Sequence, residues 1–249
     1  MKKKLIKNKK EVLREFNKEK YFNAYRFFRY KKPDLKDVDR FFYKRKRDFL
    51  ALQKEKKIMI NEIKKFSKNT KSITELGCGY GSRGLELLKF EKLKNKKFFL
   101  LDMAVNGIKL AKLIVESSKK YVSKINLGIC DFYNNKKNKI KIPKKSMIFT
   151  SYALHYKRKL SDKFLRFILK RNPTYVVHFE PVYEHFTKDS KSHNNIKNYF
   201  IENNYSLNLL TILKSYEKMK KIKIILEKKH VFGINKLLPL SIIVWKKIS

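Results

Sequence analysis

Glycine is scarce in this chain, yet four of its seven glycines fall between Gly77 and Gly84. Residues 73–82 read Ile-Thr-Glu-Leu-Gly-Cys-Gly-Tyr-Gly-Ser, an apolar run with one acidic residue followed by glycine at every second position. Glycine lets the backbone pass close to another group and adopt positive φ angles. A helical pattern comes next, so the segment predicts the strand–turn–helix unit that opens nucleotide-binding α/β domains.

The spacing of these glycines argues against two common phosphate-binding motifs. The dinucleotide motif GxGxxG would need glycine where Ser82 stands, and a P-loop would need Gly-Lys-Ser or Gly-Lys-Thr. Glu75 also precedes the turn. A carboxylate there would repel a pyrophosphate and attract a cationic group such as an amine. The turn is therefore predicted to bind a ligand that carries positive charge.

Two more carboxylates stand at the ends of predicted strands. Asp102 ends a strand over 97–102, and Asp131 ends a strand over 125–131 and is followed by Phe132. Open α/β sheets bind their ligands outside the carboxyl ends of the strands. A carboxylate at such a place can accept hydrogen bonds from two neighbouring hydroxyl groups. The glycine turn and the two acids are expected to meet at one edge of the sheet.

This set of residues resembles the cofactor motifs of class I S-adenosylmethionine-dependent methyltransferases, in which an acidic residue precedes GxGxG. The resemblance implies that Glu75 and the glycines hold the methionine end, Asp102 the ribose, and Asp131 with Phe132 the adenine. Residues 149–156 fall at the family's fourth motif, which flanks the methionine. The cofactor-binding residues implied in this way are Glu75, Gly77, Cys78, Gly79, Gly81, Asp102, Met103, Asp131, Phe132, Thr150 and Ser151.

A methyl group on a sulfonium is already activated, so alignment with the acceptor provides much of the rate. An oxygen acceptor can also need a general base, and His155 and Glu180 are the candidates. The residues predicted to contact substrate are Tyr152, His178, Glu184 and His185. For each of these side chains a structural role is the alternative. We expect no metal, because the spacing of His178, Glu180 and His185 matches no standard ligand set.

The substrate class is narrowed by what the fourth motif lacks. It has neither the Asn/Asp-Pro-Pro-aromatic box of amino-group nucleic-acid methylases nor the Pro-Cys nucleophile of cytosine methylases. Residues 151–155 resemble the small-molecule branch, and segments 178–184 and 232–245 resemble bacterial sugar O-methylating enzymes. The resemblance implies O-methylation of a small molecule or a sugar/glycan precursor. The alternatives are an RNA methyltransferase and a degenerate methyltransferase fold that serves as a binding subunit.

The formal net charge is +41. Most of the basic residues are lysines spread along the chain, and with abundant Asn and Ile this composition is typical of proteins from AT-rich genes. A basic surface that docks a polyanion such as RNA is the other interpretation. Cys78 and Cys130 form no CxxC pair, which indicates a reducing compartment. No run is long enough to span a membrane, and we expect a cytoplasmic protein.

The elements that would position these residues follow from hydrophobic periodicity. Helices over 11–30 and 36–66 predict an N-terminal helical cap, residues 1–68, that closes over the substrate; the methyltransferase domain would be 69–249. Strands alternating with helices predict an α/β fold: a Rossmann-like, seven-stranded, mostly parallel sheet with a C-terminal antiparallel hairpin. The predicted strands are 73–76, 97–102, 125–131, 147–151, 174–180, 222–231 and 240–245; the helices are 82–93, 104–119, 160–169 and a helix-rich stretch over 190–219.

Overall fold

The computed structural model describes residues 46–88, 90–117, 122–133, 140, 142–187, 190–233 and 235–248. The predicted helix over 11–30 and the first part of the predicted helix over 36–66 lie outside the described residues. The proposed division of the chain at residue 68 therefore concerns a segment of which only the last third is described.

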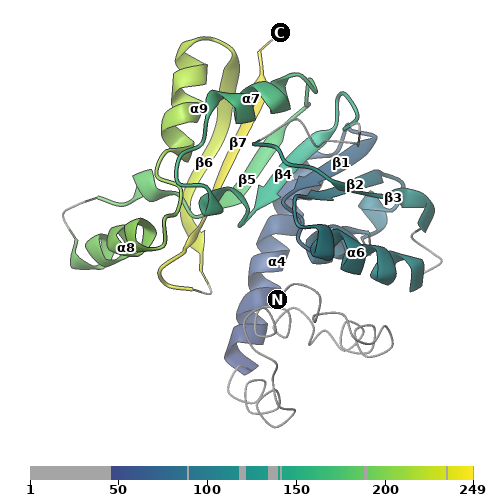
Figure 1. Ribbon diagram of the computed structural model, residues 1–249, viewed down its shortest axis with the longest axis horizontal. Helices are drawn as coiled ribbons and strands as arrows, with labels where there is room; N and C mark the ends of the chain where they lie inside the picture. Colours follow the sequence, from purple (N-terminus) through teal and green to yellow (C-terminus); the bar gives the residue numbers. More distant parts are fainter. Residues whose placement is uncertain are drawn as a thin grey trace.

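Seven strands form one sheet in the order β3-β2-β1-β4-β5-β7-β6 (Figure 1). Five of them run parallel: β1 (Ser72–Leu76), β2 (Lys97–Asp102), β3 (Ile125–Ile129), β4 (Met147–Ser151) and β5 (Val176–Glu180). Strand β7 (Leu240–Lys247) lies antiparallel between β5 and β6 (Ile222–Phe232). The predicted Rossmann-like sheet with its C-terminal antiparallel hairpin is confirmed.

Helices cover both faces of the sheet. The helices α4 (Lys46–Phe66), α5 (Ser82–Leu87) and α6 (Val105–Ser117) pack on one face, and α7 (Asp162–Leu169) and α9 (Leu209–Lys218) on the other. Every residue of β1, β4 and β5 is buried, because helices cover both faces of the sheet there. Helix α8 (Lys191–Glu202) packs in a smaller cluster around Phe186 and Phe200 and stands apart from the sheet (Figure 1).

Several predicted boundaries differ from the observed ones. The helix predicted over 82–93 ends at Leu87, because the chain becomes extended at Phe90 and then buries Leu93 in a short 3-10 turn. Strand β3 ends at Ile129, where the Cys130 amide turns to the Asp102 carbonyl, 3.0 Å away. The helix-rich stretch over 190–219 consists of the two helices α8 and α9.

Helix α4 belongs to the core of the sheet domain. Its side chains Met59, Ile63 and Phe66 are buried in the same cluster as Phe149 of β4. The last turn is fixed by Lys96, whose ammonium donates to carbonyls that follow the helix. The N-terminal half of α4 extends past the sheet on the side where β6 connects to β7 (Figure 1). The part of the predicted cap that is described therefore packs as one unit with the strands.

Candidate functional site

The site is built on the turn that follows β1. Gly77, Gly79 and Gly81 have φ angles of +77°, +60° and +81°, a region that favours glycine. A Cβ atom at Gly77 would lie 2.3 Å from the Cβ of Ala153, whereas at Gly79 no described atom lies within 4 Å. Gly77 is thus required for close packing against the loop after β4. Gly79 borders open space that a ligand can enter.

Glu75 lies beneath this turn and is fully buried. Its Oε2 accepts a hydrogen bond from the Gly84 amide, 3.1 Å away, and its Oε1 has no hydrogen-bond partner among the described residues. Burial raises the pKa of Glu75 to about 8, and the charge of Arg83 partly opposes this rise. A buried carboxyl oxygen without a donor is unfavourable. A cationic group or an N–H donor from a ligand would satisfy it.

Asp102 joins the end of β2 to the glycine turn. Its Oδ2 accepts a hydrogen bond from the Gly79 amide and its Oδ1 one from the Ala104 amide, each at 2.7 Å. Each carboxylate oxygen can accept more than one hydrogen bond, so these contacts orient Asp102 without exhausting its capacity. Cys78, inside the turn, is buried, while Met103 after the strand is 58% exposed.

The predicted adenine residues follow β3 on the same edge of the sheet. Asp131 accepts a hydrogen bond from the Tyr133 amide at 2.9 Å, which holds the carboxylate in the turn after the strand. The Phe132 ring packs against Phe164 and lies 3.9 Å from where a Cβ at Gly77 would stand. The glycine turn and the adenine-side residues are therefore neighbours, as the order of strands requires.

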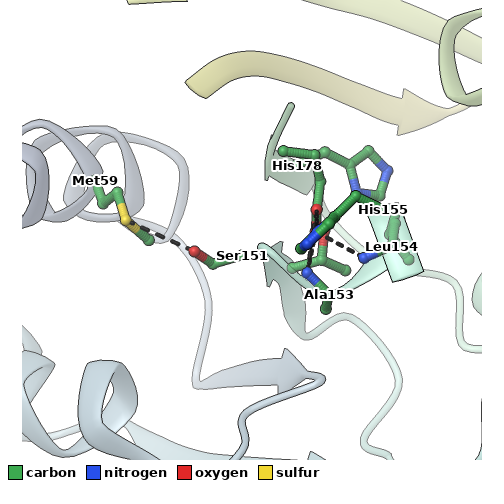
Figure 2. Close-up of polar contacts among 8 residues, drawn as sticks. Met59, Ser151, Ala153, Leu154, His155 and His178 are labelled. Atoms are coloured by element: carbon green, nitrogen blue, oxygen red, sulfur yellow. Dashed lines mark hydrogen bonds and ion pairs between the residues drawn. The ribbon is translucent and has the colours of Figure 1, made fainter. Parts of the chain in front are cut away.

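The loop after β4 connects this edge to α4. The Ser151 hydroxyl lies 3.8 Å from the sulfur of Met59 in α4, and the amides of Ala153 and Leu154 point the other way (Figure 2). Both amides donate to the Glu180 carboxylate at the end of β5, at 2.9 and 3.1 Å. Glu180 is fully buried. It therefore fixes the conformation of the predicted fourth motif.

His155 and Glu180, the two predicted base candidates, are brought together. The Nδ1 atom of His155 lies 3.6 Å from Oε2 of Glu180 and makes no hydrogen bond within the described chain. The imidazole is 2% exposed and packs against Tyr156 and Tyr205, with ring centroids 4.0 and 4.9 Å away. The pair forms an aromatic-walled dyad directly behind the loop after β4.

His178 has a different environment from the one predicted. Its ring nitrogens are hydrogen bonded to the Thr150 hydroxyl at 3.0 Å and the Trp245 indole at 2.9 Å. Burial lowers the pKa of His178 to about 4. With both nitrogens engaged inside the sheet, His178 has a structural position in place of the predicted substrate contact. The same bond engages the Thr150 hydroxyl, whose predicted cofactor contact stays a prediction.

Glu184 and His185 also point away from the dyad. Glu184 accepts a hydrogen bond from the Thr211 amide at the start of α9, at 2.9 Å. His185 contacts Ser241 of β7 at 2.9 Å and Glu227 of β6 at 3.1 Å, and burial lowers its pKa to about 4. These contacts tie the segment after β5 to its neighbours and do not place the two side chains at the glycine turn.

Two properties concern the described residues as a whole. They contain no group of three His, Cys, Asp or Glu side chains arranged to hold a metal ion. None of the helices among them is long and apolar enough to cross a membrane.

Sequence reasoning missed two polar residues at this edge, Glu55 and Arg83. Glu55 of α4 is 3% exposed and accepts a hydrogen bond from the Tyr152 hydroxyl at 3.0 Å. The Arg83 guanidinium lies 5.7 Å from the centre of the Tyr152 ring. The available signals were the position of Arg83 two residues after Gly81 and the i, i+4 spacing of Glu55 and Met59, which puts both on one helix face.

No protein family and no curated protein sequence matches this chain. Its fold does match solved structures. The mitomycin 7-O-methyltransferase MmcR has a TM-score of 0.55 at 11% identity, with 77% of this chain and 54% of that chain covered. Human N-acetylserotonin methyltransferase, solved with S-adenosylmethionine, has a TM-score of 0.53 at 14% identity, with 80% and 55% covered.

The methyltransferase domain of the bacterial protein CtHen1-C has a TM-score of 0.51 at 16% identity, with 80% of this chain and all of that domain covered. The chain thus spans only about half the length of the mitomycin 7-O-methyltransferase and of the human N-acetylserotonin methyltransferase. At these identities the likeness concerns the fold, and the fold is that of the class I methyltransferases.

Proposed function

We propose that this protein is an S-adenosylmethionine-dependent methyltransferase that methylates an oxygen of a small molecule or a sugar/glycan precursor. The observation that carries the proposal is the buried Glu75 carboxyl, whose Oε1 lacks a partner beside the turn where Gly79 borders open space. A cofactor with a positively charged amino-acid end matches both features. The class I methyltransferase fold supports the same reading.

The residues fit the three parts of this cofactor. Glu75 and the glycine turn would hold the methionine end, Asp102 the ribose hydroxyls, and Asp131 with Phe132 the adenine. The bound cofactor would supply a methyl group on a sulfonium. The protein would then align the acceptor and exclude water, since alignment provides much of the rate of such a transfer.

The dyad of His155 and Glu180 would take up the proton of an acceptor hydroxyl. A carboxylate beside Nδ1 favours a proton on that nitrogen, which makes Nε2 the basic atom of the ring. Glu180 would act here as a positioning residue, because its oxygens also hold the amides of Ala153 and Leu154. The 7-O-methyltransferase among the matched structures supports an oxygen acceptor.

The described part of the N-terminal segment supports its proposed place over the substrate. Met59 of α4 contacts Ser151 at the end of β4, and Glu55 contacts Tyr152 in the loop that follows. We include in the proposal that residues 1–68 form this cover and 69–249 the catalytic domain.

The net charge of +41 favours a second candidate, an RNA methyltransferase that docks its substrate on a basic surface. The two candidates differ in salt dependence. RNA binding driven by lysines would weaken steeply between 50 and 200 mM salt. Methylation of a small molecule would show no such steep dependence on salt. Mass spectrometry of cell extract incubated with the protein and isotopically labelled cofactor would identify which class of molecule gains the methyl group.

Calorimetry with S-adenosylhomocysteine tests the cofactor directly. Wild-type protein should bind it, Asp102→Asn should bind at least about tenfold more weakly through loss of the charged acceptor, and Glu116→Gln on the surface of α6 should bind as wild type does. A melting curve of each variant shows that the fold is retained. Absence of binding by the wild type would overturn the proposed function, and the degenerate binding subunit would become the better description.

A further inference from the structure

We propose that Arg83 binds the carboxylate of the amino-acid end of the cofactor, and that the hydrogen-bonded pair of Glu55 and Tyr152 positions it. The inference rests on the proposed function and assigns a role to a residue outside the predicted cofactor set. It also gives α4 a part in binding.

The charge balance of the site requires such a residue. Glu55, Glu75, Asp102 and Glu180 are all buried or nearly buried around the glycine turn and the loop after β4. Of these, Glu75 would contact the amino group of the ligand, and none of the four can bind an anionic group. An amino-acid end also carries a carboxylate, and a carboxylate among buried acids needs a cation or several N–H donors to offset its desolvation.

Arg83 has the right chemistry and place. It stands in α5 directly after the glycine turn, is partly exposed, and lies over the Tyr152 ring at 5.7 Å. Its charge acts on both Glu75 and Tyr152, lowering the pKa of each against the effect of burial. A guanidinium offers a planar fork of donors that matches a carboxylate with two parallel hydrogen bonds.

The ring beneath Arg83 is held from two sides. The Tyr152 hydroxyl donates to Oε2 of Glu55 at 3.0 Å, and the Tyr152 amide donates to the Phe179 carbonyl at 3.0 Å. Tyr152 has φ +49°, a strained conformation for a residue with a side chain, which persists where the surroundings fix it. Glu55 thereby determines where the ring lies, and the ring supports the guanidinium by a cation–π contact.

Three ligands separate this role from an indirect one. S-adenosylhomocysteine has the amino group and the carboxylate, its decarboxylated analogue has the amino group alone, and 5′-methylthioadenosine has neither. The binding of each would be measured by calorimetry for wild type and Arg83→Gln. Arg166→Gln, an exposed arginine of α7, is the matched control.

We expect Arg83→Gln to weaken S-adenosylhomocysteine about tenfold to hundredfold, the range for loss of a charge-assisted hydrogen bond. It should change the affinity for each of the other two ligands by less than about threefold, and Arg166→Gln should leave the affinity for all three ligands unchanged. Equal weakening of the decarboxylated analogue would mean that Arg83 acts through Glu75 and would overturn the inference, as would an unchanged affinity for S-adenosylhomocysteine. If wild type bound none of the three ligands, the proposed function itself would fail.

The positioning pair has its own test. Tyr152→Phe keeps the ring and removes only the hydrogen bond to Glu55, and Glu55→Gln replaces its charged acceptor. Each should weaken the binding of S-adenosylhomocysteine by about twofold to tenfold, with little effect on the binding of the decarboxylated analogue. The double variant should bind no more weakly than the weaker-binding of the two single variants. Additive losses, or equal losses for both ligands, would show that the pair does not act through Arg83.

Discussion

The indole Nε1 of Trp245 donates a hydrogen bond to Nε2 of His178, 2.9 Å away, between neighbouring strands β7 and β5. Indole can only donate, so Nε2 accepts and the ring proton is on Nδ1, where it donates to the Thr150 hydroxyl at 3.0 Å. This arrangement needs a neutral imidazole. Burial also disfavours the charged imidazolium and lowers the pKa of His178 to about 4.

Stability should therefore fall as the solution is acidified. The unfolded chain gains a proton on His178 near pH 6.5, while the folded chain resists it until about pH 4. Over that window the loss attributable to His178 is on the order of 3 kcal/mol. In urea unfolding, His178→Asn should be less stable than wild type at pH 7. Its free energy of unfolding should also depend less on pH between pH 6.5 and 4. An unchanged pH slope in the variant would contradict the assignment.

Glu75 should give the opposite pH dependence. Its pKa is raised to about 8 by burial, so between pH 4.5 and 8 the folded chain holds a proton that the unfolded chain has lost. Burial of Glu75 therefore lowers the free energy of unfolding above pH 8, and it has no such effect below pH 4.5, where the carboxyl is protonated in both states. Glu75→Gln should gain about 2–5 kcal/mol in stability on going from pH 4.5 to pH 9, relative to wild type. Glu91→Gln, on an exposed carboxylate, should show no such change.

Ligand binding should couple to the same proton. A cationic amino group beside Glu75 favours its charged form, so S-adenosylhomocysteine should release a proton from the wild type near pH 7. Calorimetry in buffers of different ionisation enthalpy measures this release, and Glu75→Gln should abolish it. Equal proton release by the two proteins would place the titrating group elsewhere.

The two glycines of the turn should respond differently to alanine. At Gly77 a Cβ atom would clash with Ala153 at 2.3 Å, so Gly77→Ala should destabilise the fold and displace the loop after β4. At Gly79 the added methyl meets no described atom within 4 Å, so Gly79→Ala should keep the fold at a backbone cost of about 1 kcal/mol.

Ligand binding distinguishes the pair further. The methyl at Gly79 would project into the space beside the turn in which the cofactor is proposed to lie, so Gly79→Ala should lose binding of S-adenosylhomocysteine while melting close to wild type. Gly79→Ala with wild-type affinity would show that the ligand does not pass this residue.

The fold was predictable because its signals are local and repeated. Alternation of buried strands with amphipathic helices indicated the sheet, and the glycines and Asp102 indicated the edge at which the ligand is proposed to bind. The roles of His178 and His185 were not predictable. Their partners, Trp245 and Ser241, come from β7, more than fifty residues away, and only the antiparallel pairing of that strand brings them close.

The same limit applies to α4. Its sequence showed an amphipathic helix, but nothing local told whether the apolar face covers a substrate or packs on the sheet. In the structure Glu55 contacts Tyr152 in the loop after β4, while Met59, Ile63 and Phe66, in the next three turns, are buried in the main core. The described C-terminal half of the helix packs on the sheet, and a cover over the substrate stays a prediction.

The packing of α4 on the sheet leads to a test of where the domain begins. Ile63 is 1% exposed and packs in the cluster that includes Phe149 of β4, so Ile63→Ala should lower the free energy of unfolding by about 2–5 kcal/mol. Lys57→Ala, on the exposed side of the same helix, should change it by less than about 0.5 kcal/mol. Urea unfolding followed by Trp245 fluorescence reports on the sheet itself. If Ile63→Ala left that transition unchanged, α4 would be an extension outside the cooperative unit. A shift of the whole transition would show that α4 and the sheet unfold as one cooperative unit, so that the proposed cover and the catalytic domain are joined through this helix.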